Sequence, residues 1–175
     1  MRCSDFISSE SVGAFIVPSK SKDLADAYLD SFNMVGMPYI FAIRSVLAEV
    51  KLLAESAEIE SFMEKIALAY AKQNPHLQSQ IESLKILAVG SIMLNMSHHL
   101  TPPDGRKKTN PMTLETFSAF FAAPMLTYAK QKAAAFYESI TKSEIVMPSE
   151  QGLILGMTFD WFIGNQFSDR ASIFG

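Results

Sequence analysis

The chain has 175 residues, of which 49% are hydrophobic, and its 15 lysines and arginines against 18 aspartates and glutamates give a formal net charge of −3. This length and composition suit one domain with a substantial core, and the acidic excess argues against a protein that binds nucleic acid. The single cysteine, Cys3, excludes an internal disulfide framework, and the lack of a long apolar run favours a soluble, cytoplasmic protein without a signal peptide or membrane span.

The first half of the chain carries three patterns typical of amphipathic helices. Apolar residues at every fourth position predict a helix over residues 23–32. Gly36 interrupts this pattern, and Pro38 suits the first turn of a second helix that continues to Val50. A third helical pattern stops at the Asn74-Pro75 pair, because the residue before a proline disfavours helical geometry.

The second half begins with the most apolar stretch, residues 79–99, which predicts a central helix buried on nearly all sides. Residues 101–111, with three prolines and one glycine, predict a loop. Thr113 can cap a short helix, and Pro124 opens a last long helix. No convincing strand pattern precedes residue 150, so the fold class is predicted as all-α, with about six or seven helices.

The character of the sequence changes near Pro148, after which glycines alternate with large apolar side chains. We therefore divide the chain into a helical domain, residues 1–147, and an apolar, aromatic C-terminal segment, residues 148–175. Two interpretations of that segment stay open. It either folds back over an apolar groove or serves as an interaction tail.

Motifs for cofactors and metals are missing from the sequence. It has no glycine-rich phosphate loop and no His-Glu-x-x-His pattern. His98 and His99 are adjacent, so their side chains diverge by about 100° on a helix and cannot chelate one metal ion. We expect no metal site and no cofactor.

Two segments carry a family resemblance. One runs from Ile43-Arg44-Ser45-Val46-Leu47 to Glu60, and the other is Ser91-Ile92-Met93-Leu94-Asn95-Met96-Ser97-His98-His99. Together they resemble the Sec-seven homology domain, the catalytic module of Arf guanine-nucleotide exchange factors. Residues 50–60 are similar, without a gap, to the family pattern Phe-Arg-Leu-Pro-Gly-Glu-Ala-Gln-Lys-Ile-Asp. Residues 92–100 are similar to Ile-Met-Leu-Asn-Thr-(Asp/Ser)-Leu-His-Asn, and the whole resemblance runs from about residue 12 to residue 145.

The resemblance implies a right-handed superhelix of α-helices with an apolar groove that holds the switch regions of an Arf-family small GTPase. It also implies a glutamate finger that expels Mg²⁺ and GDP from that GTPase, and Glu55 occupies the finger's position. By residue type alone, Glu55 is an ordinary glutamate of a helix's first turn, which the helix dipole favours. Peripheral contact with a membrane and a role in vesicle trafficking are further implications of the family.

Five groove residues follow from the same resemblance. Glu82 would pair with a basic group of the GTPase, and Met93 and Met96 would form an adaptable apolar surface. Asn95 and His99 match the second motif. Each has a plainer interpretation, which is a solvated carboxylate for Glu82, core packing for the methionines, and satisfied backbone groups at a helix end for Asn95 and His99.

Several positions depart from the family. Leu53-Ala54 replaces Pro-Gly before Glu55, Glu58 replaces a lysine, and Leu100 replaces an asparagine. Met34-Val35-Gly36-Met37 is similar to the family's Phe-x-Gly-Leu turn, and most of the helices that precede this turn in the family are missing. These departures leave two alternatives to an active exchange factor. One is a non-catalytic Arf-binding module with a degenerate finger, and the other is a helical protein that binds a hydrophobic ligand beneath Trp161 and Phe162.

Overall fold

The structure is a computed structural model that describes residues 13, 22–52, 56–99 and 110–148. Within these ranges it contains six α-helices, two short 3-10 helices and no strand, so the all-α prediction is confirmed. In chain order, the elements are α2 (Lys22–Asp30), α3 (Tyr39–Leu47), α4 (Ser56–Gln73), η3 (Pro75–Gln80), α5 (Ile81–His99), α6 (Leu114–Ala119), η4 (Pro124–Leu126) and α7 (Thr127–Lys142).

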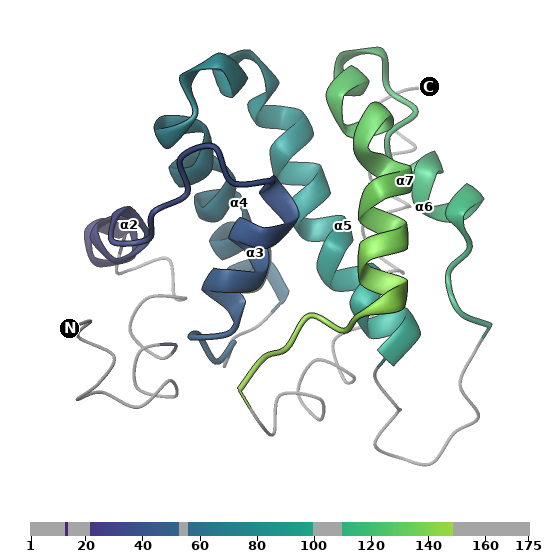
Figure 1. Cartoon of the computed structure of the whole chain (residues 1–175), viewed down its shortest axis with the longest axis horizontal. Coiled ribbons are helices and arrows are strands. Elements are labelled where there is room, and N and C mark those ends of the chain that lie inside the picture. The colour runs from purple at the N-terminus through teal and green to yellow at the C-terminus, as the bar shows by residue number, and fades with distance from the viewer. Residues whose placement is uncertain (1–12, 14–21, 53–55, 100–109, 149–175) are drawn as a thin grey trace.

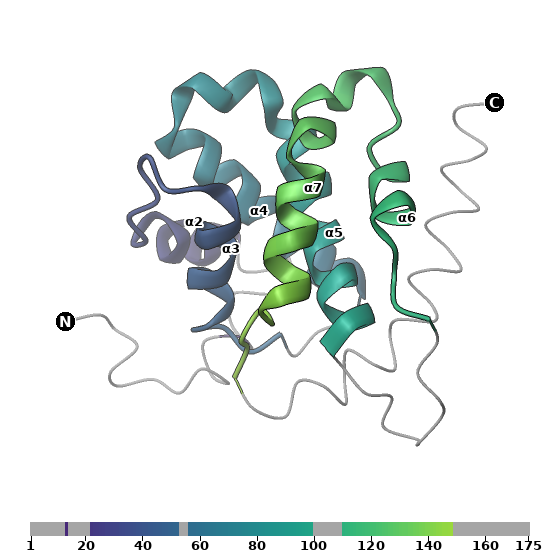
Figure 2. The same ribbon diagram turned by 45° about the vertical axis from the view of Figure 1, so that its right-hand side comes forward.

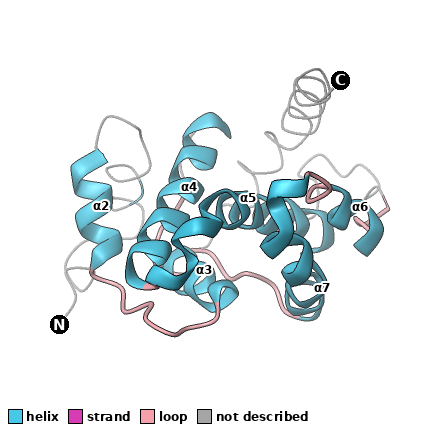
Figure 3. Ribbon diagram, turned by 90° about the horizontal axis from the view of Figure 1, so that it is seen from above, coloured by secondary structure: helices cyan, strands magenta, loops and turns pink. Residues whose placement is uncertain are grey.

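Helix α5 is the centre of the fold. It packs against α4 on one side and α7 on the other, while α2 packs against α4 and α6 against α7. Seen from above, the helices form a row from α2 through α5 to α6 and α7 (Figure 3). Gly90 of α5 lets α6 approach closely, because a Cβ atom there would lie 3.2 Å from the Phe117 ring. Most α5 side chains are buried, as the apolar sequence predicts.

Several predicted helix ends agree with the structure. Helix α4 ends directly before the Asn74-Pro75 pair. Thr113 caps α6, since its hydroxyl oxygen accepts a hydrogen bond of 3.2 Å from the amide of Thr116. These signals depend on local backbone chemistry, so they can be read from a few residues.

Other predicted ends are wrong by two or three residues. Helix α3 ends at Leu47 and not at Val50, although Val50 is fully buried outside the helix. A 3-10 turn occupies the start of the predicted central helix, so that α5 begins at Ile81. A similar turn begins at Pro124, and α7 follows it. Apolar spacing indicates which residues are buried. It can continue beyond the end of a helix, because the chain there is still buried.

The turn between α2 and α3 is held by the C-terminal end of α4. Gly36 has a φ of 65°, and its amide donates a 2.9 Å hydrogen bond to Asn74 Oδ1. The side-chain nitrogen Nδ2 of Asn74 donates to the carbonyl oxygens of Met34 and Tyr70, both at 3.0 Å. Gln73 Oε1 accepts from the amide of Met34 at 2.8 Å. Because Asn74 is only 3% exposed, water cannot replace these bonds.

We expect Asn74→Ala to destabilise the fold by about 3 kcal/mol, because it removes three hydrogen bonds made by a buried side chain, each worth about 1 kcal/mol. Urea denaturation followed by circular dichroism measures the change. The control is Asn33→Ala, which removes a long 3.4 Å bond to the exposed amide of Val35 in the same turn. Equal effects of the two substitutions would contradict the proposed role of Asn74.

We expect Gly36→Ala to cost about 1 kcal/mol of unfolding free energy, because a left-handed φ strains a residue with a Cβ atom. No atom would clash with that Cβ, so the cost lies in the backbone alone. Gly36→Asn should cost less, since asparagine tolerates this conformation better. The same denaturation experiment ranks the variants, and a larger loss for asparagine than for alanine would disprove the explanation.

Candidate functional site

One face of α5 is accessible over the first half of the helix and buried over the second half, and the rest of the helix is largely buried. The residues of this face are spaced by four, three, four and three residues, which places them within an arc of about 80° on an ideal helix. They are Glu82, Ile86, Val89, Met93 and Met96, and we call them the α5 stripe. The stripe offers one charged end and an apolar remainder.

Exposure decreases along the α5 stripe. Glu82 is exposed and forms a 3.2 Å ion pair with Lys85, one turn away. Ile86 and Val89 are half-buried, whereas Met93 and Met96 are only 7% and 8% exposed. Three residues predicted for the site, Glu82 and the two methionines, therefore share one face. Sequence analysis missed Ile86 and Val89, although their spacing from Glu82 would have identified them.

Asn95 lies on a different face of α5 and is fully buried. Its Oδ1 atom accepts a 2.7 Å hydrogen bond from the amide of Ile145, in the segment that follows α7. Its Nδ2 atom has no hydrogen-bond partner among the described residues. The observed contact of Asn95 is thus with the backbone of its own chain.

The two adjacent histidines at the end of α5 also bind backbone. Nε2 of His99 lies 2.6 Å from the carbonyl oxygen of Ile140 in α7, and Nε2 of His98 lies 2.8 Å from that of Met112. A carbonyl only accepts, so each Nε2 atom carries the hydrogen. The two rings therefore bind different segments, since His99 binds α7 and His98 binds the segment before α6. Over the described ranges, no group of three or more histidine, cysteine or acidic side chains could hold a metal ion.

The predicted finger, Glu55, lies outside the described residues, as do Leu53, Ala54 and Leu100. Trp161 and Phe162 of the C-terminal segment also lie outside them. The chain on either side of residues 53–55 is defined, because Leu52 is fully buried and α4 begins at Ser56. Glu55 thus directly precedes the first residue of α4. In the part of the chain that the structure describes, no helix has the length and apolar character needed to cross a membrane.

Comparison with known proteins supplies the family. Residues 1–145 match the Sec7 domain family. The chain is 35% identical over 131 residues to brefeldin A-inhibited guanine nucleotide-exchange protein 2 of Arabidopsis thaliana, covering 71% of this chain and 7% of that protein. It is 32% identical over 108 residues to the ADP-ribosylation factor guanine nucleotide-exchange factor SEC7 of Saccharomyces cerevisiae, covering 61% and 5%. The chain thus spans less than a tenth of these relatives.

The fold gives the same result. The structure of ARF1-GDP bound to a Sec7 domain complexed with brefeldin A is similar, with a TM-score of 0.67 and 25% identity over 84% of this chain and 73% of that one. The family match, the related sequences and the shared fold agree. The chain belongs to the Sec7 domain family.

Proposed function

We propose that this chain accelerates guanine-nucleotide exchange on an Arf-family small GTPase. The observation that carries the proposal is the α5 stripe, a largely apolar line that is accessible from Glu82 to Val89 and buried at Met93 and Met96. Membership of the Sec7 domain family supports it, as do the exchange activities in the names of the relatives. The proposal also carries the expectation of peripheral membrane contact during vesicle trafficking, which the family resemblance implies.

In this proposal, the α5 stripe receives the switch regions of the GTPase. Met93 and Met96 adapt to apolar side chains, because the thioether chain is flexible and polarisable. Glu82, at the charged end, exchanges its partner Lys85 for a basic group of the GTPase. Asn95 and His99 contribute to the same surface by holding the end of α7 against α5.

Glu55 would act on the nucleotide through its charge. A carboxylate about 4 Å from a phosphate charge raises the energy of the bound nucleotide by about 4 kcal/mol at an effective dielectric constant near 20. That energy corresponds to roughly a thousandfold faster release. The same carboxylate would displace the GTPase's Mg²⁺, which otherwise neutralises the phosphates. No covalent bond changes in this step. The nucleotide is released because the exchange factor and the nucleotide weaken each other's binding to the GTPase.

We expect Glu55→Lys to abolish the accelerated release of fluorescent GDP from an Arf protein, while binding to the nucleotide-free GTPase persists. The control is Glu115→Lys, which reverses an exposed charge on α6, away from the α5 stripe. Binding without acceleration by the unmodified chain would favour a non-catalytic module. Neither binding nor acceleration at high protein concentration would overturn the proposal.

We expect Val89→Asp to weaken GTPase binding at least about tenfold, because a carboxylate would be desolvated in the middle of an apolar contact. Val89 is only half-buried in the free chain, so the melting temperature should change little. Ala134→Asp on the exposed face of α7 is the matched control. Calorimetric titration with nucleotide-free GTPase measures both variants, and unchanged binding by Val89→Asp would exclude the α5 stripe as the contact surface.

A further inference from the structure

The segment that follows α7 is hydrogen-bonded to a side chain of α3. Residues 143–147, which we call the α7 strap, follow the last turn of α7. The Arg44 guanidinium donates to the carbonyl oxygens of Ser139 at 3.0 Å, Ser143 at 2.6 Å and Glu144 at 2.5 Å. A cation at the C-terminal end of a helix is favoured by the exposed carbonyls there. One side chain of α3 therefore caps α7 and starts the α7 strap.

The α7 strap is also held from α5. The amide of Ile145 donates to Asn95 Oδ1 at 2.7 Å, and both residues are fully buried. The α7 strap passes from the lower end of α7 towards α3 (Figures 1 and 2). It thus connects Arg44 of α3 with Asn95 of α5 through three residues of backbone, Ser143 to Ile145.

A second, direct contact joins the same two helices. The hydroxyl of Tyr39 in α3 donates a 3.1 Å hydrogen bond to the carbonyl oxygen of Leu84 in α5. Burial raises the pKa of Tyr39, so the hydroxyl keeps its proton. Leu84 and Asn95 are about 16 Å apart along the axis of α5. Two attachments that far apart fix the direction of α3 and not only its distance from α5.

From this geometry, we propose that Arg44 and Asn95 are positioning residues for nucleotide exchange. Helix α3 ends at Leu47, eight residues before Glu55. By holding α3 through the α7 strap, the two residues set where the segment bearing Glu55 begins relative to the α5 stripe. This inference rests on the proposed function. The fork of the guanidinium matters, because the single ammonium of lysine cannot reproduce its fixed set of donors.

Steady-state exchange kinetics of the full chain test the proposal. Arg44→Ala should lower kcat by about tenfold to a hundredfold, as misplacement by about 1 Å does, and leave KM for the GTPase within about twofold. Arg44→Lys should fall between Arg44→Ala and the unmodified chain. A rise in KM with unchanged kcat would overturn the proposal.

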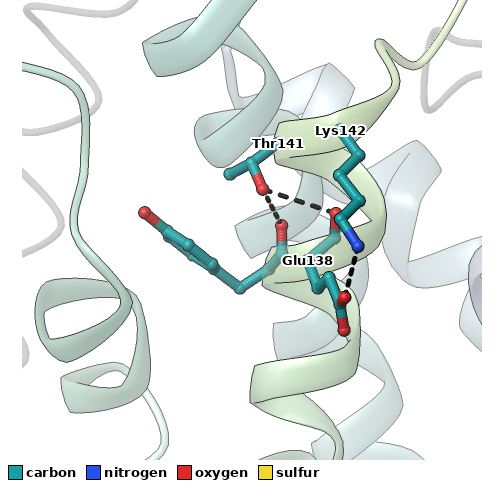
Figure 4. A network of polar contacts seen from close by, with 4 residues as sticks. Glu138, Thr141 and Lys142 are labelled. Carbon is teal, nitrogen blue, oxygen red and sulfur yellow. Dashed lines mark hydrogen bonds and ion pairs between the residues drawn. The ribbon is translucent and has the colours of Figure 1, made fainter.

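Lys142→Ala provides the matched control. Lys142 lies in the last turn of α7, and within the described ranges it pairs with exposed Glu138 across one helical turn (Figure 4). That hydrogen bond lowers the pKa of Glu138. Lys142→Ala should leave kcat and KM unchanged. A loss of kcat equal to that of Arg44→Ala would contradict a specific role for Arg44.

Amide hydrogen exchange gives a readout that needs no GTPase. The amides of Ala48 and Glu49 close the end of α3 by donating to the carbonyl oxygens of Arg44 and Val46. Asn95→Ala should speed their exchange together with that of Ile145, although Asn95 belongs to another helix. Faster exchange at Ile145 alone would overturn the positioning role. The proposed function fails by a different result, which is an unmodified chain that does not accelerate GDP release.

Discussion

The burial of α5 is the constraint on which the rest of the structure depends. A polar group on a buried helix costs free energy unless it has a partner within the protein, because water is excluded. Ser91 meets this requirement inside the helix, by donating to the carbonyl oxygen of Leu87. Asn95, Ser97, His98 and His99 instead bind backbone groups of other segments. The polar side chains of α5 therefore organise the chain around it, and its apolar side chains supply the core.

The sequence was sufficient to predict the fold class and most of the helices. Apolar spacing and the helix-end signals at Asn74-Pro75 and Thr113 depend only on nearby residues. The sequence was insufficient where a buried residue lies outside a helix, as Val50 does beyond the end of α3. For the site, the expected residues Glu82, Met93 and Met96 lie on one face of α5, whereas Asn95 lies on another. Adjacent residues such as Asn95 and Met96 point about 100° apart on any helix, and a sequence can show this. It cannot show which segment each face meets, and the contact of Asn95 with Ile145 became visible only in the structure.

The second motif thus interleaves two kinds of residue. Met93 and Met96 continue the α5 stripe as buried side chains, whereas Asn95 and His99, four residues apart, hold the end of α7. Substitutions at neighbouring positions can therefore affect either the surface or the scaffold beneath it. Ile145, which Asn95 binds, is the last residue of the family match. The extent of the family match is consistent with the α7 strap being part of the domain itself.

The attachment made by Arg44 differs in kind from the pairs on the surface. Its partners are neutral carbonyl oxygens, and not carboxylates that mobile ions can screen. Ion pairs such as Glu82 with Lys85 weaken as ionic strength rises. The internal geometry of the domain is therefore far less sensitive to salt than any charged contact on its surface. In concentrated salt, the scaffold would keep its shape while the charged contacts on its surface weakened.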